Sequence, residues 1–504
     1  MSIDALVEGA AGLGAASAAG AALLIDPPRA RGRTMVAALV LAGVALEPLV
    51  WARLHEQFSR RPSFVVAGVV VGVAVLIALA LMIRRHPPLL ALLAFAALPF
   101  RVPLTLGGDT ANLLIPLYVV IVAGCLAAAL RPLELPDRSP PPAVRRLDRV
   151  LLVVLVLYAL QALYSSDLEQ AVKNIGFFYV PFALLYRLLR DIPWTPRLLV
   201  RCFSIVVGLA VLFALVGFLE FGTGRLLIPN AKVLHANDIK PYFRVNSLFF
   251  DPNIYGRFLA LTMIALATRL LWSVRRREVW GIAALLALLW AGLVLSLSQS
   301  SFAALLVGLA ILAAVRWRIV PVMAIVVVLA GAGVAVALVK PSVVGLKNHS
   351  TAALDSATSG RADLVKGGVK MFGDRPVWDF GSGAFQKQYR ARRHITAKRI
   401  AAISHTIPVT VAAEQGIVGL AAYLALLVAA LALLFGGLRS AVGPRVPSAA
   451  GLARLVAAAA FCGLVVHTFV YAAFLEDPLT WVLLGLVAAL RYAPVPAGRP
   501  DRTG

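Results

Sequence analysis

The sequence predicts an all-α membrane protein whose helices cross the bilayer many times. Its 504 residues are 61% hydrophobic, above the ~45–50% of a soluble domain, and its mean hydropathy is +0.87. Apolar runs of roughly 17–25 residues recur along the chain, and each is long enough to cross a bilayer as a helix. The runs are continuously apolar and do not alternate, which argues against a β-barrel.

Run length and flanking charge predict about fifteen spans. They lie near residues 5–25, 34–50, 63–83, 88–101, 111–130, 149–163, 172–189, 199–220, 253–271, 279–297, 300–315, 319–339, 407–436, 454–474 and 477–490. We expect six regions, which are N-terminal helices (1–130), a Pro- and Arg-rich cytoplasmic linker (131–147), central helices (148–339) with an outer loop (221–252), a large basic outer loop (340–406), C-terminal helices (407–491) and a cytoplasmic tail (492–504).

The formal net charge of +24 comes mostly from Arg in short clusters between apolar runs. Such clusters are typical of cytoplasmic loops of membrane proteins, so nucleic-acid binding is not expected. The clusters at 29–33, 138–149 and 187–201 fall on one side if the spans alternate, whereas the arginines within 53–61 do not. The three cysteines all lie inside apolar runs, which indicates neither a disulfide framework nor a metal site.

The loop 340–406 carries a large excess of basic residues on the predicted outer side. Its Lys and Arg residues are Lys340, Lys347, Arg361, Lys366, Lys370, Arg375, Lys387, Arg390, Arg392, Arg393, Lys398 and Arg399. Attraction to the anionic lipids of the cytoplasmic leaflet does not explain charge on the outer side. We therefore expect these residues to face an anionic ligand, because clustered Arg suits bidentate phosphate contact. A solvated basic face is the alternative.

Three short polar stretches accompany this loop. Asp251 precedes Pro252, as expected of a helix cap, whereas Arg244 has no evident structural task and is placed to reach a phosphate. Polar residues 298–301 interrupt a long apolar stretch, and a tight turn is preferred there over a contact with a substrate hydroxyl. Gly381 and Gly383 permit close backbone approach.

His405 ends the basic loop, and Pro408 belongs in the first turn of the next helix. The imidazole is therefore expected just outside a positive helix N-terminus, which favours the neutral form that a general base needs. A structural histidine is the alternative. Glu414 follows nine residues later, so in a regular helix its side chain points away from that of His405. We interpret Glu414 as a buried group that is either structural or substrate-facing. Glu476-Asp477-Pro478 is interpreted as a turn and cap.

Carboxylates are scarce on the predicted outer side beside abundant Arg. A divalent cation that bridges a diphosphate needs several carboxylates. We therefore expect no metal and no other cofactor, with cationic side chains stabilising the leaving group instead.

Together these stretches resemble the O-antigen ligase and O-antigen polymerase superfamily over roughly residues 90–490. The pattern consists of 244–253, the Ser-rich break at 296–301, Gly381 to Phe385, and His405 through the Gly416-Ile417-Val418-Gly419-Leu420 segment. The chain departs from it at Gln299 and Ser300, where the family often has an Arg after Ser, and at Thr406, where it often has Asn.

The resemblance implies a membrane glycosyltransferase of the C-type fold with about 12–15 helices. Such an enzyme takes a glycan from undecaprenyl diphosphate on the periplasmic side of the bacterial inner membrane and passes it, with inversion, to an acceptor hydroxyl on a glycan or lipid. By position, His405 is the base and Arg361 and Arg244 hold the diphosphate.

Other residues take supporting roles in the same interpretation. The expected substrate contacts are Lys387, Arg390, Arg392, Arg393, Arg399, Glu414 and Asn253. A polymerase that joins two lipid-linked glycans, a protein-glycosylating relative and a membrane transporter are the alternatives.

Overall fold

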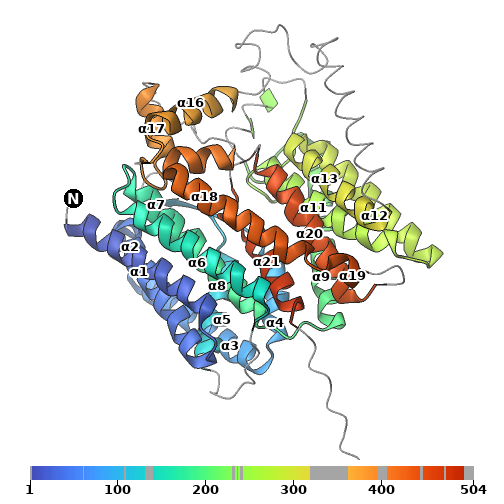
Figure 1. The fold of residues 1–504 in the computed structure, drawn as a ribbon, viewed down its shortest axis with the longest axis horizontal. Helices are drawn as coiled ribbons and strands as arrows, with labels where there is room; N and C mark the ends of the chain where they lie inside the picture. Colours follow the sequence, from blue (N-terminus) through green and yellow to red (C-terminus); the bar gives the residue numbers. More distant parts are fainter. Residues whose placement is uncertain are drawn as a thin grey trace, which may run out of the picture.

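The computed structural model of the chain describes residues 3–60, 62–106, 109–130, 140–229, 233–234, 237–238, 242–317, 361–377, 379–393, 406–442, 447–469, 471 and 473–492. Within these ranges the chain is almost wholly helical (Figure 1). Ten of the described helices are long and apolar enough to cross a membrane, and three shorter apolar helices accompany them. The predicted fold class, a polytopic helical membrane protein, is confirmed. The predicted span 319–339 lies outside the described residues.

The helices follow the predicted spans in order. The N-terminal group consists of α1 (Ile3–Leu24), α2 (Pro28–Arg60), α3 (Pro62–Arg85), α4 (Pro88–Ala97) and α5 (Ile115–Ala129). The central group consists of α6 (Pro142–Ala162), α7 (Leu168–Asn174), the π-helical turn η1 (Ile175–Tyr179), α8 (Val180–Arg190), α9 (Pro196–Thr223), α11 (Pro252–Leu271), α12 (Arg276–Ser296) and α13 (Gln299–Arg316). The C-terminal group consists of α16 (Arg361–Asp374), α17 (Phe385–Arg392), α18 (Ile407–Phe435), α19 (Leu438–Val442), α20 (Ala449–His467) and α21 (Pro478–Leu490).

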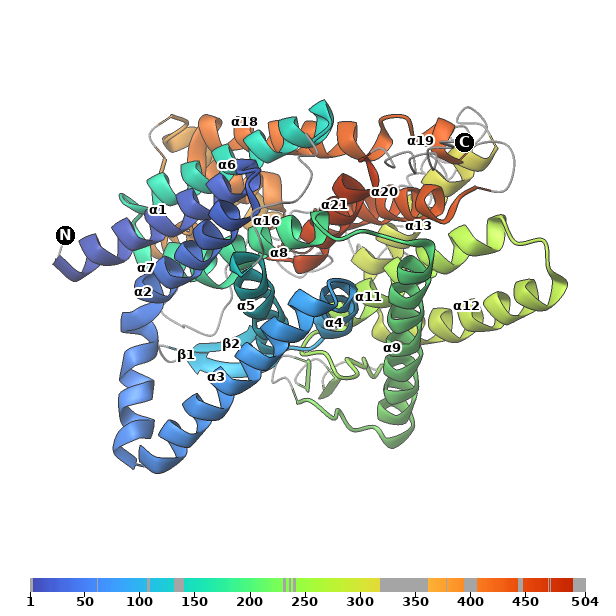
Figure 2. The same ribbon diagram turned by 90° about the horizontal axis from the view of Figure 1, so that it is seen from below.

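A short β-hairpin is the departure from an all-α fold in the described part of the chain. Strand β1 (Val102–Leu106) pairs with β2 (Asp109–Leu113) in antiparallel register, with Val102 opposite Leu113. The hairpin lies between α4 and α5, close to α3 (Figure 2). A Gly-Gly pair separates the two strands, which is a strong hairpin signal in sequence. The predicted spans 88–101 and 111–130 therefore correspond to the shorter helices α4 and α5.

Helical structure also occupies two segments that were predicted as loops. Helix α2 continues to Arg60 through the basic residues near 53, and α16 and α17 lie inside the predicted loop 340–406. Helix α17 and the end of α2 are rich in Ala, Leu, Arg, Lys and Gln, which are strong helix formers, whereas α16 contains three glycines. Hydropathy alone does not detect such polar helices.

Small residues let the helices pack closely. Helix α6 packs between α1 and α18, and α13 packs against α11 and α20 (Figure 1). A Cβ atom added at Gly463 of α20 would lie 2.7 Å from the backbone oxygen of Ala304 on α13. Such contacts are typical of helix pairs in membranes, where close backbone approach replaces the hydrophobic driving force.

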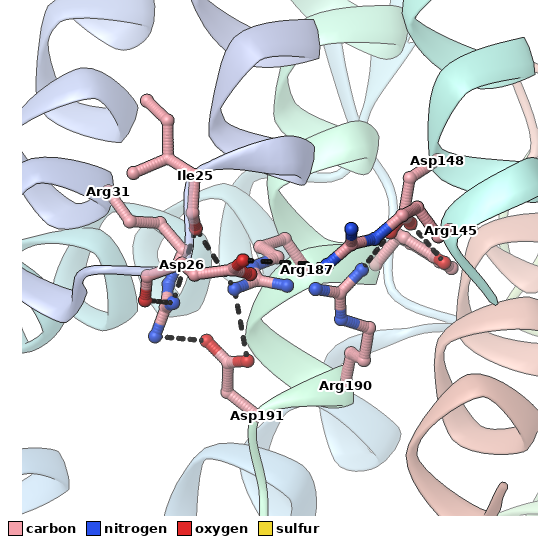
Figure 3. Close-up of polar contacts among 9 residues, drawn as sticks. Ile25, Asp26, Arg31, Arg145, Asp148, Arg187, Arg190 and Asp191 are labelled. Atoms are coloured by element: carbon pink, nitrogen blue, oxygen red, sulfur yellow. Dashed lines mark hydrogen bonds and ion pairs between the residues drawn. The ribbon is translucent and has the colours of Figure 1, made fainter. Parts of the chain in front are cut away.

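Arginines from three of the predicted basic clusters meet at one end of the helices, in a group that we call the arginine face (Figure 3). Arg31 Nη2 lies 2.9 Å from Asp191 Oδ2, and Arg190 forms a buried ion pair with Asp148. Arg145 lies 3.8 Å from Asp26. The clusters therefore share one side, as alternating spans require. That this side is the cytoplasm remains a prediction of the positive-inside rule.

Helix α18 is broken at Gly416. This residue has φ 61° and ψ −160°, outside the helical region, and the next amide, that of Ile417, donates instead to the backbone oxygen of Pro376 at 2.8 Å. A Cβ atom at Gly416 would lie 2.7 Å from that same oxygen. The break therefore attaches the segment after α16 to the middle of a spanning helix.

Gly416→Ala is expected to lower the free energy of unfolding by about 1–3 kcal/mol, because an L side chain is strained at this φ. Chemical unfolding of the purified protein in detergent measures the loss. Gly43→Ala on α2 is the matched control, because nothing lies within 4 Å of its added Cβ. The control should be neutral or stabilising by up to about 1 kcal/mol. Equal losses in both variants would contradict a special role for the break.

A candidate substrate cavity at the α16 end

The end of the bundle opposite the arginine face is where α16, α17 and the first turns of α18 gather, and we call it the α16 end (Figure 1). The turn 379–385 docks there on the end of α6. Gln161 Nε2 donates to Asp379 Oδ2 at 2.8 Å, and Ser382 Oγ donates to the backbone oxygen of Tyr158 at 2.7 Å. Gly381 and Gly383 have φ 87° and 78°, the left-handed region that glycine adopts without strain. The predicted close approach is confirmed.

Glu414 fixes this turn to α18. Its Oε2 accepts from the Gly383 amide and its Oε1 from the Phe385 amide, both at 3.0 Å. The carboxylate thereby satisfies amides at the start of α17, which have no partner inside that helix. Glu414 is buried, so the prediction of a buried structural group holds, and it also lines a cavity.

The cavity has a volume of about 320 Å³, within the roughly 300–1,000 Å³ range of ligand pockets. Its walls come from α6, α7, η1, α11, the start of α17, α18 and the segment 471–476. Apolar and aromatic side chains dominate, with a few polar groups among them, as in most small-molecule sites. Ile407 lines the cavity and lies two residues after His405.

Two arginines form what we call the cationic end of the cavity. Arg257 of α11 and Arg101, between α4 and β1, both line it. Arg257 Nη1 lies 2.5 Å from Asp477 Oδ2, and its guanidinium carbon lies 5.9 Å from the Tyr471 ring centroid. Burial lowers the pKa of Arg101, and the nearby Asp477 opposes that effect.

Asp477 also caps α21, because its Oδ1 accepts from the Leu479 amide at 3.0 Å. The predicted cap is therefore confirmed, and the ion pair with Arg257 is additional. Asp251 likewise caps α11, as predicted, by accepting from the Asn253 amide at 2.7 Å. Its second oxygen accepts from the Tyr471 hydroxyl at 3.1 Å.

The rest of the polar lining forms what we call the acidic end. Glu414 and Glu476 both line the cavity and repel each other. Burial raises the pKa of Glu476 to about 6, and the Tyr179 hydroxyl lies 3.5 Å from its Oε1. Asn174 donates to the Tyr158 hydroxyl at 2.8 Å, so amide, phenol and carboxylate groups alternate along this wall.

The structure places the main predicted site residues as follows. His405 and Arg399 lie outside the described residues, as does the Arg361 side chain, although Arg361 begins α16. Arg244 is partly buried, and its Nε donates to the backbone oxygen of Ser296 at 3.1 Å. It therefore does have a structural task, at the end of α12, contrary to expectation. It does not line the cavity.

The predicted basic substrate contacts that the structure describes lie on and beside α17, at or near the surface. Arg392 pairs with Asp374 and Arg393 with Asp363, each at 2.5 Å, so both attach α17 to α16. Lys387 Nζ donates to the backbone oxygen of Ser166 at 2.5 Å. Arg390 lies on the same helix. This basic surface lies near the cavity. That it attracts an anionic donor toward the cavity stays a prediction.

Asn253, in the first turn of α11, contacts the serine turn between α12 and α13. Its Oδ1 accepts from Ser298 Oγ at 3.0 Å, and Ser298 Oγ lies 2.7 Å from Ser301 Oγ. Leu297 has φ 50°, which makes the tight turn that was preferred for this stretch. Ser300 Oγ lies 3.1 Å from His467 Nε2 and joins the turn to α20.

Sequence reasoning missed Arg101, Arg257, Tyr423 and Glu476 as lining residues. The signal for Arg257 was available, because an ionisable residue inside an apolar span indicates function by default. Glu476 was interpreted only as part of a turn. Nothing in the sequence indicated that residue 101 approaches residues 257 and 477.

Residues 284–424 match the family model described as O-antigen ligase. The chain carries an O-antigen ligase domain. The matched segment includes α13, α16, α17 and the first half of α18, and so contributes Gly383 and Glu414 to the cavity. It supports the predicted membership of the O-antigen ligase and polymerase superfamily. No curated protein matches the chain.

The O-antigen ligase domain supports a ligase- or polymerase-like function in the assembly of cell-surface polysaccharide. With ten apolar helices in the described part, the protein is a multi-pass membrane protein. Lipid-linked glycans are the substrates that this family implies.

Proposed function

We propose that the protein is a glycosyltransferase that moves a glycan from a polyprenyl diphosphate to an acceptor hydroxyl on the periplasmic side of the bacterial inner membrane. The observation that carries this proposal is the cavity at the α16 end, which combines the buried Arg257 and the half-buried Arg101 with polar groups suited to a sugar. The O-antigen ligase domain supports the reaction class, since its matched residues form one wall.

The cationic end suits a diphosphate. Arg257 is 1% exposed, and its Nε has no hydrogen-bond partner among the described residues. A buried guanidinium with an unused N–H stabilises an anion more strongly than an exposed one, because little water screens it. Arg101 adds a second cation beside it. These two arginines join Arg361 and Arg244 as candidates for holding the leaving group.

The proposed step is a single displacement. His405 accepts the proton of the acceptor hydroxyl while that oxygen attacks the anomeric carbon. The bond from that carbon to the diphosphate oxygen breaks, and the electron pair leaves with the lipid diphosphate, whose charge the arginines stabilise. Attack from the face opposite the leaving group inverts the anomeric configuration.

Reconstitution tests the proposal directly. The purified protein in nanodiscs is mixed with a polyprenyl-diphosphate glycan and either a lipid A-core acceptor or a second lipid-linked glycan, and released lipid diphosphate is measured. Release that depends on the first acceptor indicates a ligase, and release that depends on the second indicates a polymerase. No release with any acceptor, from protein that binds the donor, would contradict a transferase.

Chelation is expected to leave this activity unchanged within about twofold, since guanidinium groups supply the charge stabilisation that a metal would otherwise provide. The assay is repeated in EDTA, with magnesium or manganese added back to a matched sample. If activity vanished in EDTA and returned with either metal, the hypothesis that cationic side chains alone stabilise the leaving diphosphate would be refuted.

A further inference from the structure

The cavity contains an unused hydroxyl. Tyr423 of α18 lines the cavity and is 4% exposed, yet its hydroxyl has no hydrogen-bond partner among the described residues. Its ring packs edge-to-face on Phe474, with centroids 5.7 Å apart. A buried phenol usually has a partner, because an unpaired group loses its hydrogen bonds to water and gains none in exchange. A ligand hydroxyl in the cavity would supply that partner.

The carboxylates of the acidic end are not neutralised by the arginines. Arg257 is already paired with Asp477, whereas Glu476 is approached by the Tyr179 hydroxyl and Glu414 by two backbone amides. The acidic end therefore presents carboxylate, amide and phenol oxygens to a ligand, and these groups favour hydrogen-bond donors.

We propose that the acidic end is a sugar subsite that accepts a neutral or amino sugar and rejects a uronic acid. This inference rests on the proposed function and specifies the sugar class of that same site. Sugar hydroxyls donate to Glu476 and pair with the Tyr423 hydroxyl, and an ammonium group gains further from the two carboxylates. The rings of Tyr179 and Phe474 offer apolar faces to the sugar ring.

Rejection follows from like charge. A sugar carboxylate in this end would face Glu414 and Glu476 in a cavity lined mostly by apolar and aromatic side chains, and like charges that face each other weaken binding. Specific sites commonly exclude competitors through such repulsion as well as through attraction to the correct ligand. The cationic end does not relieve this repulsion, because the leaving diphosphate occupies it.

Three lipids test the inference by equilibrium binding to the protein in nanodiscs. They are a bare short-chain polyprenyl diphosphate, the same lipid carrying N-acetylglucosamine, and the same lipid carrying glucuronic acid. The N-acetylglucosamine lipid is expected to bind at least about tenfold more tightly than the glucuronic acid lipid, a free-energy difference of about 1.4 kcal/mol. Failure of the bare lipid to bind would contradict the proposed function. Binding of the bare lipid with equal affinity for both glycolipids would exclude the donor sugar from this subsite.

Two variants locate the effect. Glu476→Gln keeps the shape and removes the charge, so the ratio between the two glycolipids should fall to within about threefold. Tyr423→Phe should weaken the N-acetylglucosamine lipid by about three- to tenfold, as expected for one lost hydrogen bond, and leave the bare lipid unchanged. Tyr255→Phe is the matched control, because its hydroxyl is also buried and unpaired among the described residues but lies outside the cavity. Retention of the wild-type ratio in Glu476→Gln would overturn the assignment.

The sugar in this subsite belongs either to the donor or to the acceptor. A second binding experiment distinguishes these two possibilities. Methyl N-acetylglucosaminide and methyl glucuronide are titrated onto protein saturated with the bare lipid. Discrimination between these glycosides, lost in Glu476→Gln, assigns the subsite to the acceptor sugar. Discrimination confined to the lipid-linked sugars assigns it to the donor. Absence of discrimination in both arms overturns the proposal.

Lowering the pH should act like the Glu476→Gln substitution. The pKa of Glu476 is about 6, so at pH 5 this carboxyl is mostly protonated, whereas a sugar carboxylate with an ordinary pKa remains charged. The groups that face Glu476 are Glu414 of α18, the adjacent Asp477, and the phenols of Tyr179 and Tyr158. We expect the glycolipid ratio to shrink between pH 7 and pH 5 in the wild type and to shrink less in Glu476→Gln. A ratio that shrank equally in both would overturn the assignment to Glu476.

Discussion

Replacing His405 with alanine is expected to reduce glycan transfer by about 10²–10⁴-fold, the usual contribution of a general base. Donor affinity should change little, because the arginines, not the imidazole, hold the diphosphate in the proposed mechanism. Released lipid diphosphate measures the transfer, and equilibrium binding of the bare polyprenyl diphosphate measures donor affinity. The proposal that His405 acts at the cavity rests on its sequence position, two residues before Ile407, which lines the cavity.

His86→Ala is the control for this prediction. His86 is exposed and follows α3, whose last residues belong to the basic clusters assigned to the opposite side of the membrane. The control should transfer glycan at the wild-type rate. Wild-type turnover in His405→Ala would remove the imidazole from the mechanism, and an equal loss of donor binding would indicate a binding role instead.

Much of the fold was predictable because membrane helices are encoded locally. An apolar run must be helical in a bilayer, since no water is available to satisfy its backbone groups. The caps at Asp251 and Asp477 were equally local, because each carboxylate precedes a proline that fits the first helical turn. The polar helices α16 and α17 were missed because their surroundings, not their hydropathy, make them helical.

The candidate site was less predictable because its geometry is not local. The pairing of Arg257 with Asp477 joins two helices that are distant in sequence, and the approach of Arg101 depends on the hairpin that follows it. Charge counts directed attention to the basic residues of the 340–406 segment. Arg392 and Arg393 nevertheless form exposed ion pairs with α16, whereas the arginines that line the cavity come from outside that segment.

The buried pair between Arg257 and Asp477 gives the largest expected effect on stability. Arg257→Met should lower the free energy of unfolding by about 3–5 kcal/mol, because it leaves the Asp477 charge buried without a partner. Chemical unfolding in detergent measures the loss. Arg393→Met is the matched control, since it breaks an ion pair of the same 2.5 Å length whose side chains are 46% and 35% exposed. The control should cost at most about 1 kcal/mol.

A second substitution separates the loss of charge from the loss of packing. In Arg257→Met/Asp477→Asn no charge is left unpaired, and the asparagine oxygen can still accept from the Leu479 amide at the start of α21. The double variant should therefore recover most of the lost stability, yet bind the bare polyprenyl diphosphate more weakly than the wild type. Recovery of both stability and lipid binding would make the pair purely structural. If stability recovers but lipid binding does not, the Arg257–Asp477 pair is not needed for folding. The buried arginine then serves to bind the ligand.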